Sequence, residues 1–240
     1  MNKFMMTMAA ALLASGAMAA RSNAPVQAMR GNEGGPETSG LEAKLTIDQY
    51  PRIGKQCLLA APRLEGGSTL GRCYTKPRSW IVLESKYTTF AKSLEQLTFT
   101  WHVVLDVRSA TNKDREGQKK RAPYTYFTTS VTYQNIPRGS HAASVCLHPS
   151  YLEVYGEPCA VALVVSNQNG DILGGDTVGI APFNPQKKKA GYKFWEDTRI
   201  MDARDAKTGI PMVERRQGLQ DRSKTIWALV NPDDYELVAQ

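Results

Sequence analysis

Residues 97–107 read LTFTWHVVLDV, and this stretch decides the fold. Apolar and polar side chains alternate along it, with Phe99, Trp101, Val103 and Leu105 on one side and Thr98, Thr100, His102 and Asp106 on the other. A period of two residues is typical of a β-strand that buries one face. The stretch therefore predicts a half-buried strand whose inner face carries large apolar side chains.

Further strands are predicted on both sides of this stretch. Residues 124–134 (YTYFTTSVTYQ) repeat the alternation, residues 41–50 and 141–147 form shorter runs, and residues 159–178 read as a hairpin with its turn at Asn167–Asp171. Because no long helix intervenes, the series predicts a mainly β fold, namely an antiparallel immunoglobulin-like sandwich. A small β-barrel is the alternative fold.

The composition is that of an ordinary globular protein. The chain has 240 residues, of which 42% are hydrophobic and 22% are charged, and its formal net charge is +7. These values exclude a disordered polar chain, a collagen-like chain and a multi-span membrane protein. They leave room for one domain with sizeable extensions.

The first twenty residues have the parts of an export signal. Lys3 gives a positive start, the run FMMTMAAALLASG is apolar, and Ala17-Met18-Ala19 supplies small residues for cleavage. We predict a signal peptide over residues 1–20, with a short buried helix as the alternative, and a mature chain in the periplasm, at the outer-membrane surface or outside the cell. No later segment reaches the ~18 apolar residues of a membrane helix, so no transmembrane segment is predicted.

The rest of the chain divides into three parts by composition. Residues 21–40 are rich in Gly, Pro, Ser and Asn and are predicted to form a flexible leader. Residues 41–182 form the sandwich domain. Residues 183–240 form a basic extension that contains aromatic residues, which we expect to be irregular or briefly helical and to pack on the domain or on a partner.

Four cysteines lie in two clusters, Cys57 with Cys73 and Cys146 with Cys159. In an exported protein an even number of cysteines favours disulfides, and sequence proximity favours pairing within each cluster, although pairing between clusters stays open. Zinc binding would require closely spaced CxxC or HxxxH pairs, which the sequence lacks. We therefore predict structural disulfides and no metal site.

No combination of residues indicates a catalytic reaction. The sequence has neither a GxSxG nucleophile motif nor a GxxxxGK[ST] phosphate loop. Its three histidines, His102, His141 and His148, are scattered, and His102 is predicted to be a surface residue on the polar side of its strand. We expect no catalytic residues and no cofactor.

Basic and aromatic residues near the C-terminus are the best candidates for binding. Residues 187–224 contain eleven Lys or Arg against six Asp or Glu, interspersed with aromatic residues. The candidate binding residues are Lys187, Lys188, Lys189, Trp195, Lys224, Trp227 and Tyr235. Such a surface fits an acidic protein partner or an anionic glycan, and in an exported protein nucleic acid is not expected.

The chain resembles small exported proteins of gut Verrucomicrobia-type bacteria. The resemblance rests on three features: the export signal, the strand series from LTFTWHVVLDV to CAVALVVSNQNGDIL, and the closing DRSKTIWALV. Among these, the chain is similar to an immunoglobulin-like protein associated with type IV pilus machinery. The resemblance implies a non-enzymatic component of a surface appendage. A pilin carries a long N-terminal apolar helix, whereas the apolar run here is short, so the resemblance implies an accessory component and not a filament subunit.

The sequence thus leads to a secreted, non-enzymatic module that binds a surface-associated or pilus-associated protein. Two alternatives stay open: a module that binds carbohydrate or a polyanion, and a hydrolase whose site has no recognisable motif. The first alternative would use tryptophans beside Lys and Arg to stack on its ligand. The second would require a concave cluster of His or carboxylates with perturbed pKa values.

Overall fold

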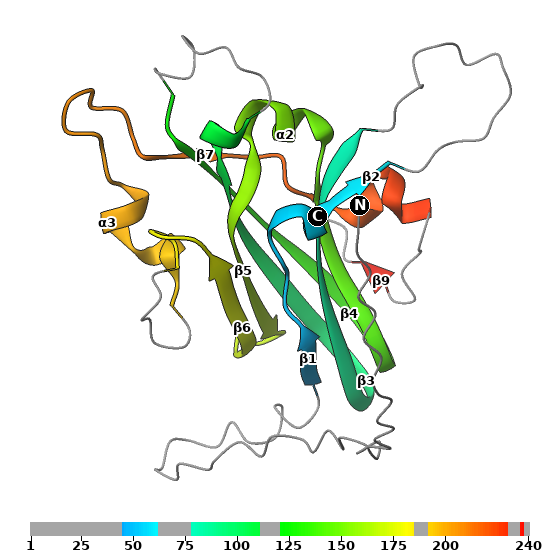
Figure 1. Cartoon of the computed structure of the whole chain (residues 1–240). Helices are drawn as coiled ribbons and strands as arrows, with labels where there is room; N and C mark the ends of the chain where they lie inside the picture. Colours follow the sequence, from blue (N-terminus) through cyan, green and yellow to red (C-terminus); the bar gives the residue numbers. More distant parts are fainter. Residues whose placement is uncertain (1–44, 62–77, 111–120, 185–191, 230–235, 238–240) are drawn as a thin grey trace, which may run out of the picture. The chain divides into compact units, whose positions relative to one another are not determined.

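The computed structural model describes residues 45–61, 78–110, 121–184, 192–229 and 236–237 (Figure 1). Its strands are β1 (Leu45–Gln49), β2 (Leu58–Ala60), β3 (Ser79–Asp106), β4 (Tyr124–Leu147), β5 (Glu157–Asn167), β6 (Ile172–Gly179), β7 (Val213–Arg216), β8 (Gln220–Asp221) and β9 (Glu236–Leu237). The α-helices are α2 (Pro149–Tyr155) and α3 (Thr198–Met201), and the 3-10 helices are η2 (Gly54–Cys57), η5 (Val107–Ser109), η6 (Phe194–Glu196), η7 (Arg222–Lys224) and η8 (Ile226–Leu229). The predicted signal peptide and leader lie outside the described residues and stay predictions.

The strands belong to one nine-stranded sheet, which is organised around β3 and β4. These two long strands pair antiparallel along almost their whole length and form a two-stranded ribbon. On the β3 side the ribbon is extended by β1, β2 and β5, and β6 follows β5 at the end of the sheet. On the β4 side it is extended by β7, β8 and β9, of which β7 is parallel to β4.

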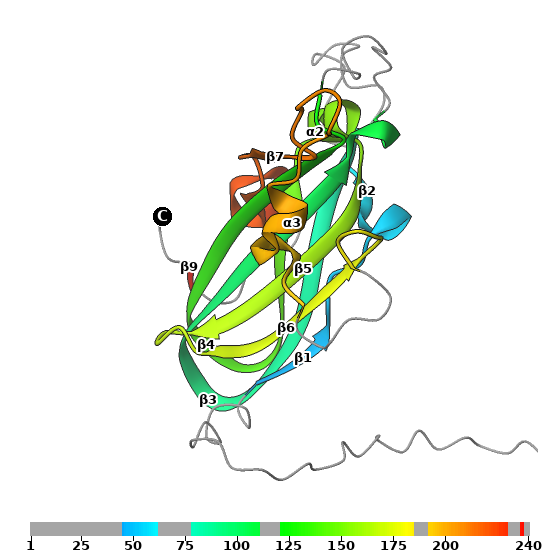
Figure 2. The same cartoon turned by 90° about the vertical axis from the view of Figure 1, so that its left-hand side faces the viewer.

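The ribbon folds back on itself near the middle of both strands. The β3–β4 register shifts between Thr89 and Ser93, and on β4 Asn135 has a positive φ of 53°. Figure 2 shows β3 curving back at the bottom of the view. As a result the rings of Tyr87 and Phe99 lie 4.9 Å apart, whereas twelve residues of straight strand would separate them by about 40 Å. The two halves of one sheet therefore face each other across a common core.

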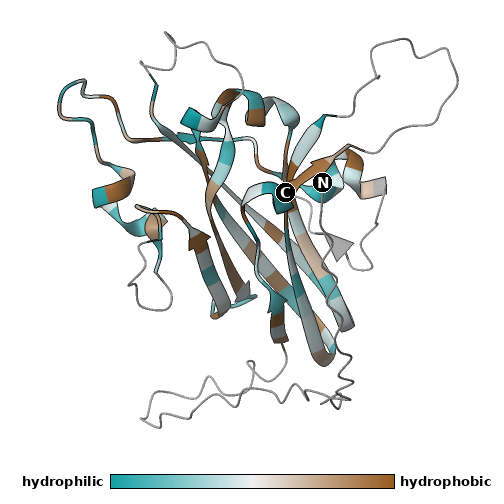
Figure 3. Cartoon of the chain, viewed as in Figure 1, coloured by the Kyte–Doolittle hydropathy of each residue, from teal (hydrophilic) through white to brown (hydrophobic). Residues whose placement is uncertain are grey.

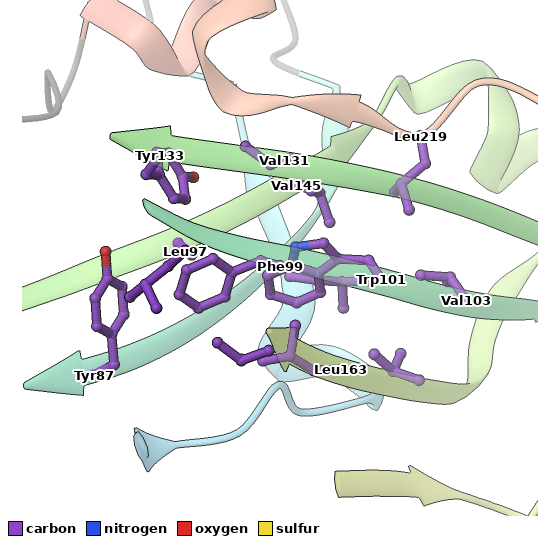
Figure 4. Packing of buried hydrophobic residues seen from close by; sticks show 14 of the residues in the cluster. Tyr87, Leu97, Phe99, Trp101, Val103, Val131, Tyr133, Val145, Leu163 and Leu219 are labelled. Atoms are coloured by element: carbon purple, nitrogen blue, oxygen red, sulfur yellow. The ribbon is translucent and has the colours of Figure 1, made fainter. Parts of the chain in front are cut away.

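The core lies between these two halves, and Figure 4 shows its packing. The predicted alternation is confirmed, because the inner-face residues of β3 are all fully buried: Phe99, Trp101, Val103 and Leu105. Side chains from the other half of the ribbon complete the same cluster, among them Ile81, Leu83, Val145 and Leu147. Apolar and polar residues form bands along both long strands in Figure 3. The period of two seen in the sequence thus sets which face of the ribbon turns inward.

A second apolar cluster lies on the outer side of β3, β4 and β5. Residues 192–216, named here the cover segment, pack over Val104 and Ala160 with Phe194 and Met201. Phe183 joins the same cluster and is fully buried. The cover segment contains η6, α3 and β7, and β7 continues the sheet along β4. The C-terminal part of the chain therefore contributes to the packing of the sheet.

The mainly β class is confirmed, and two details differ from the sequence prediction. The run at residues 141–147 is not a separate strand but the end of β4, which continues through the bend. The sheet is also mixed and continuous, because β7 is parallel to β4 and the two facing halves share β3 and β4. Between β4 and β5 the chain forms the short helix α2, with His148 as its N-cap.

The described residues contain no disulfide, because Cys57, Cys146 and Cys159 are buried free thiols. Cys146 follows the inward-facing Val145 on β4 and lies beside Thr225, on the outer side of the first half of the ribbon. Cys159 belongs to the outer cluster on the second half. The core separates these two thiols, so their closeness in sequence does not bring them together. Cys73 lies outside the described residues.

The inner face of β3 allows a matched stability test. Replacing the fully buried Trp101 by Ala should lower the free energy of unfolding by about 3–5 kcal/mol, because a large cavity is left between the two halves. Phe90→Ala on the same strand is the control, because Phe90 is 50% exposed and its loss should cost less than about 1 kcal/mol. Guanidinium unfolding followed by tryptophan fluorescence or circular dichroism gives both values. Equal losses for the two variants would contradict the fold-back of the ribbon.

The free thiols should react only after unfolding. Burial raises the pKa of Cys57 to about 11 and the pKa values of Cys146 and Cys159 to about 12. At pH 8 we expect iodoacetamide to modify these thiols on the order of a hundredfold more slowly in the native chain than in guanidinium, because the thiolate is the nucleophile. Peptide mass spectrometry measures each site. A Cys146–Cys159 pair that stays unmodified after unfolding without reductant would show that the predicted disulfide exists.

Candidate functional site

The three histidines of the chain each have a structural partner, which limits the possible chemistry. The Nε2 of His141 donates to the Pro137 carbonyl at 2.9 Å. The Nδ1 of His148 accepts the backbone N–H of Ser150 at 3.2 Å and so caps α2. In both cases a ring nitrogen is engaged by the fold itself.

Five hydroxyl side chains form a polar face on the outer side of the second half of the ribbon. We name it the hydroxyl face: Thr98 and Thr100 of β3 with Thr128, Ser130 and Thr132 of β4. Thr98 Oγ1 lies 3.1 Å from Thr132 Oγ1, and Thr100 Oγ1 lies 3.0 Å from Ser130 Oγ, in each case directly across the strand pair. Four of these side chains are half-buried and Thr128 is exposed. Cross-strand hydroxyl pairs of this kind stabilise a sheet and hold their side chains in fixed positions.

Small residues continue the hydroxyl face onto the neighbouring strands. Val164 of β5 lies opposite Thr100, and Gly175 of β6 lies opposite Val164. A row across the four strands therefore consists of Gly175, Val164, Thr100 and Ser130, none of which is large or charged. The result is a row of small, uncharged residues across the four strands.

His102 closes one end of the hydroxyl face. Its ring stacks on Trp195 of the cover segment with 3.9 Å between centroids and 6° between planes, and its Nδ1 lies 2.6 Å from the Tyr126 hydroxyl. His102 is only 7% exposed, so the prediction of a surface histidine was wrong. The reason is that Trp195, distant in sequence, covers the ring.

The surroundings of His102 keep its imidazole ring neutral and engage its Nδ1 in a hydrogen bond. Burial, with a smaller effect of the Lys193 ammonium, lowers the pKa of His102 to about 4. The Nδ1 of the neutral ring is hydrogen-bonded to the Tyr126 hydroxyl at 2.6 Å in either tautomer, so this nitrogen is not available to take a proton from Thr128, whose Oγ1 lies 3.4 Å away. A base must be free to accept the proton of its nucleophile. The cluster therefore suits positioning and contact, not proton transfer.

Ion pairs neutralise much of the positive charge in the cover segment. Carboxylates contact four of its basic groups, in the pairs Lys193–Glu196, Arg199–Asp197, Arg215–Asp202 and Arg216–Glu214. The Arg199 guanidinium and the Tyr192 hydroxyl hold the pKa of Asp197 at about 2, so this carboxyl is ionised at all physiological pH values. Charge that is paired internally contributes little to the attraction of a polyanion.

The structure describes three of the seven predicted binding residues, and they belong to separate elements. Trp195 lies in η6 against His102, whereas Lys224 and Trp227 belong to η7 and η8, which follow β8. The Trp227 indole nitrogen is buried and has no hydrogen-bond partner among the described residues. Lys187, Lys188, Lys189 and Tyr235 lie outside the described residues. Among the three described members of the set, Trp195 borders the hydroxyl face through its contact with His102.

Sequence reasoning placed the hydroxyl side chains correctly but gave them no role. The alternation at residues 97–107 and 124–134 had already put these threonines and the serine opposite the buried side chains. What no local pattern showed is that β3 and β4 lie side by side in the register that pairs Thr100 with Ser130. That register, which sequence alone does not reveal, turns separate polar residues into one surface.

The described part of the chain offers neither a metal site nor a membrane-spanning helix. No group of three or more His, Cys, Asp or Glu there is arranged to hold a metal ion. Among the same residues, no helix has the length and apolar character needed to cross a membrane.

Comparison with known proteins places this geometry in context. A family model for pilus-related proteins matches residues 58–239, which is well over half of the chain. A crystal structure of a protein from Akkermansia muciniphila aligns with a TM-score of 0.54 and 17% sequence identity, over 82% of this chain and 94% of that one. At this identity the structural match shows a shared fold. No curated protein sequence matches significantly.

The neutral state of His102 predicts a pH dependence of stability. The pKa is about 4 in the folded chain and 6.5 in the reference state, so the unfolded chain binds the extra proton between these values. The free energy of unfolding should therefore fall by up to about 3 kcal/mol as the pH is lowered from 7 to 4. In His102→Gln this component should disappear, while the control His148→Gln, at an exposed cap, should retain it. Urea unfolding at a series of pH values measures the slopes, and parallel slopes for wild type and His102→Gln would refute the assignment.

Proposed function

The chain belongs to the pilus-related family whose model matches residues 58–239, and on that premise we propose that it is an exported, non-enzymatic binding component of a type IV pilus-like surface apparatus. The family match is the observation that carries the proposal. The export signal predicted over residues 1–20 agrees with a protein of the cell surface. In this view the facing halves of the folded sheet correspond to the two layers of an immunoglobulin-like sandwich.

A binding role is supported by the way the reactive groups are used. Each imidazole is engaged in the fold, and His102 in particular is neutral and covered by Trp195. Burial raises the pKa values of the described thiols well above neutrality, which leaves little nucleophilic thiolate. An active site would instead require a nucleophile beside a free base.

We place the contact with the partner on the hydroxyl face. Its side chains are small and held by cross-strand hydrogen bonds, so little conformational entropy is lost when a partner covers them. The face lacks charged side chains, which favours a partner with an uncharged, hydrogen-bonding surface over an acidic one. The internal ion pairs of the cover segment point the same way, and they count against the polyanion alternative.

Lysine substitutions on the hydroxyl face provide the test. The mature chain is mixed with sheared pilus filaments from the source bacterium and sedimented. We expect the wild-type chain to co-sediment, and the double variant Thr100→Lys/Thr132→Lys to lose about tenfold or more of that binding, because two buried, unpaired ammonium groups oppose the contact. Ala206→Lys, on an exposed turn of the cover segment, is the control for added charge and should bind like wild type.

The outcomes distinguish a failure of the proposed pilus-associated function from a failure of the proposed contact surface. If the wild-type chain does not co-sediment with filaments, the pilus-associated function is refuted. If the double variant binds as well as Ala206→Lys while circular dichroism shows that both are folded, the partner uses another surface. Turnover of a glycan by the purified chain would contradict the non-enzymatic role.

A further inference from the structure

A cavity of about 340 Å³ opens where the ribbon folds back, away from the hydroxyl face. Three segments line it: the start of β1, residues 93–97 of β3 just after the bend, and residues 167–169 in the turn that joins β5 to β6. These segments meet at the lower end of the sheet in Figure 1. We name this cavity the bend pocket. Its volume lies at the lower end of the range for small-molecule sites, about 300–1,000 Å³.

The floor of the bend pocket is apolar. Four leucines contribute to its lining: Leu45, Leu94, Leu97 and Leu173. Leu94 and Leu97 are buried members of the main core, so this part of the wall is fixed by the packing between the two halves of the ribbon. A fixed apolar floor gives a ligand a surface to cover without reorganisation of the protein.

The rim of the bend pocket is polar, and its side chains are not used by the fold. The lining includes Ser93, Glu95, Gln96, Gln168 and Asn169. The side chains of these five residues form no hydrogen bond or ion pair with the described part of the chain, in contrast to the hydroxyl face. A pocket with an apolar floor and a few convergent polar groups has the usual character of a ligand site.

The turn that carries two of these side chains is held rigidly. Asn167 Oδ1 accepts the backbone N–H groups of Asn169 and Asp171, both at 2.9 Å, and Asn167 Nδ2 donates to Asp171 Oδ2 at 2.8 Å. These three hydrogen bonds use most of the donors and acceptors of the Asn167 side-chain amide. They also fix the backbone from which Gln168 and Asn169 project. The polar rim is therefore anchored on the side of the turn.

The chemistry of the lining selects a class of ligand. Glu95 is the single charged group among the described lining residues, so an anion would be repelled and a zwitterion would find no cation for its carboxylate. No aromatic ring is present in that lining to stack on a flat heterocycle. The side-chain amides can both donate to and accept from sugar hydroxyls, the Glu95 carboxylate can accept from them, and leucines suit the C–H face of a sugar ring. We propose that the bend pocket binds a neutral sugar residue.

This inference goes beyond the proposed function and does not depend on it, because the pocket and the hydroxyl face are separate surfaces. The test uses the folded mature chain and a panel of methyl glycosides of neutral hexoses and N-acetylhexosamines, followed by saturation-transfer NMR and titration calorimetry. Sialic acid and glucosamine serve as anionic and cationic comparisons. We expect saturable binding of at least one neutral glycoside and no binding of sialic acid.

Matched variants locate the site. Gln168→Ala and Asn169→Ala should each raise the dissociation constant about fivefold, as expected for one lost hydrogen bond. Gln217→Ala removes an amide from an exposed residue outside the pocket and should leave binding unchanged. Absence of saturable binding by every neutral glycoside would overturn the proposal, as would equal effects of Gln168→Ala and Gln217→Ala. Stronger binding of glucosamine that Glu95→Gln abolishes would also overturn it, because the site would then select an amine.

Discussion

The contact of Tyr87 with Phe99 closes the folded ribbon, and the other features of the structure depend on that closure. A straight two-stranded ribbon of this length would expose one apolar face along its whole extent, and isolated two-stranded ribbons are at best marginally stable in water. Folding back lets the two halves bury each other, so no second sheet is needed. The bend requires local departures from regular pairing, which lie at the Thr89–Ser93 register shift and at Asn135.

Closure of the ribbon also determines what happens to the edges of the sheet. It brings β1 close to β6, where a Cβ on Gly174 would lie 2.7 Å from Ile47 Cδ1, so glycine permits this approach. The Asn184 amide donates to the Thr177 carbonyl and blocks part of the β6 edge. Along β4, three short strands occupy the opposite edge. A side chain that occupies an edge carbonyl and edge strands of only two to four residues both make strand addition less favourable.

How much the sequence could predict depends on whether a feature is local. The alternation around Phe99 and Trp101 is local, and it gave the correct inner face. The bend was not predicted, because residues 90–92 (FAK) contain neither Gly nor Pro and look like ordinary strand. The burial of His102 depends on Trp195, which lies far along the chain, and no short-range pattern reports such a contact.

The prediction of a Cys146–Cys159 disulfide was wrong because it, too, relied on local sequence and not on the folded arrangement. Proximity in sequence favoured Cys146 with Cys159, although the alternation on β4 already turned Cys146 to the side opposite the inward-facing Val145. Once the ribbon folds, the outer sides of its two halves point in opposite directions, so two outward-facing thiols on different halves cannot meet. Facing direction therefore outweighs sequence separation in a folded ribbon.

The distribution of charge bears on how the hydroxyl face and the bend pocket would select their ligands. The chain carries a net charge of +7, yet the hydroxyl face has no charged side chain and the described lining of the bend pocket has a single carboxylate. In the cover segment four basic groups are paired with carboxylates. A positive protein with neutral contact surfaces repels other positive proteins at a distance and offers little local charge to a polyanion at the contact itself. Selection between partners would then rest on shape and hydrogen bonding, which are short-range and are fixed here by the register of β3 and β4.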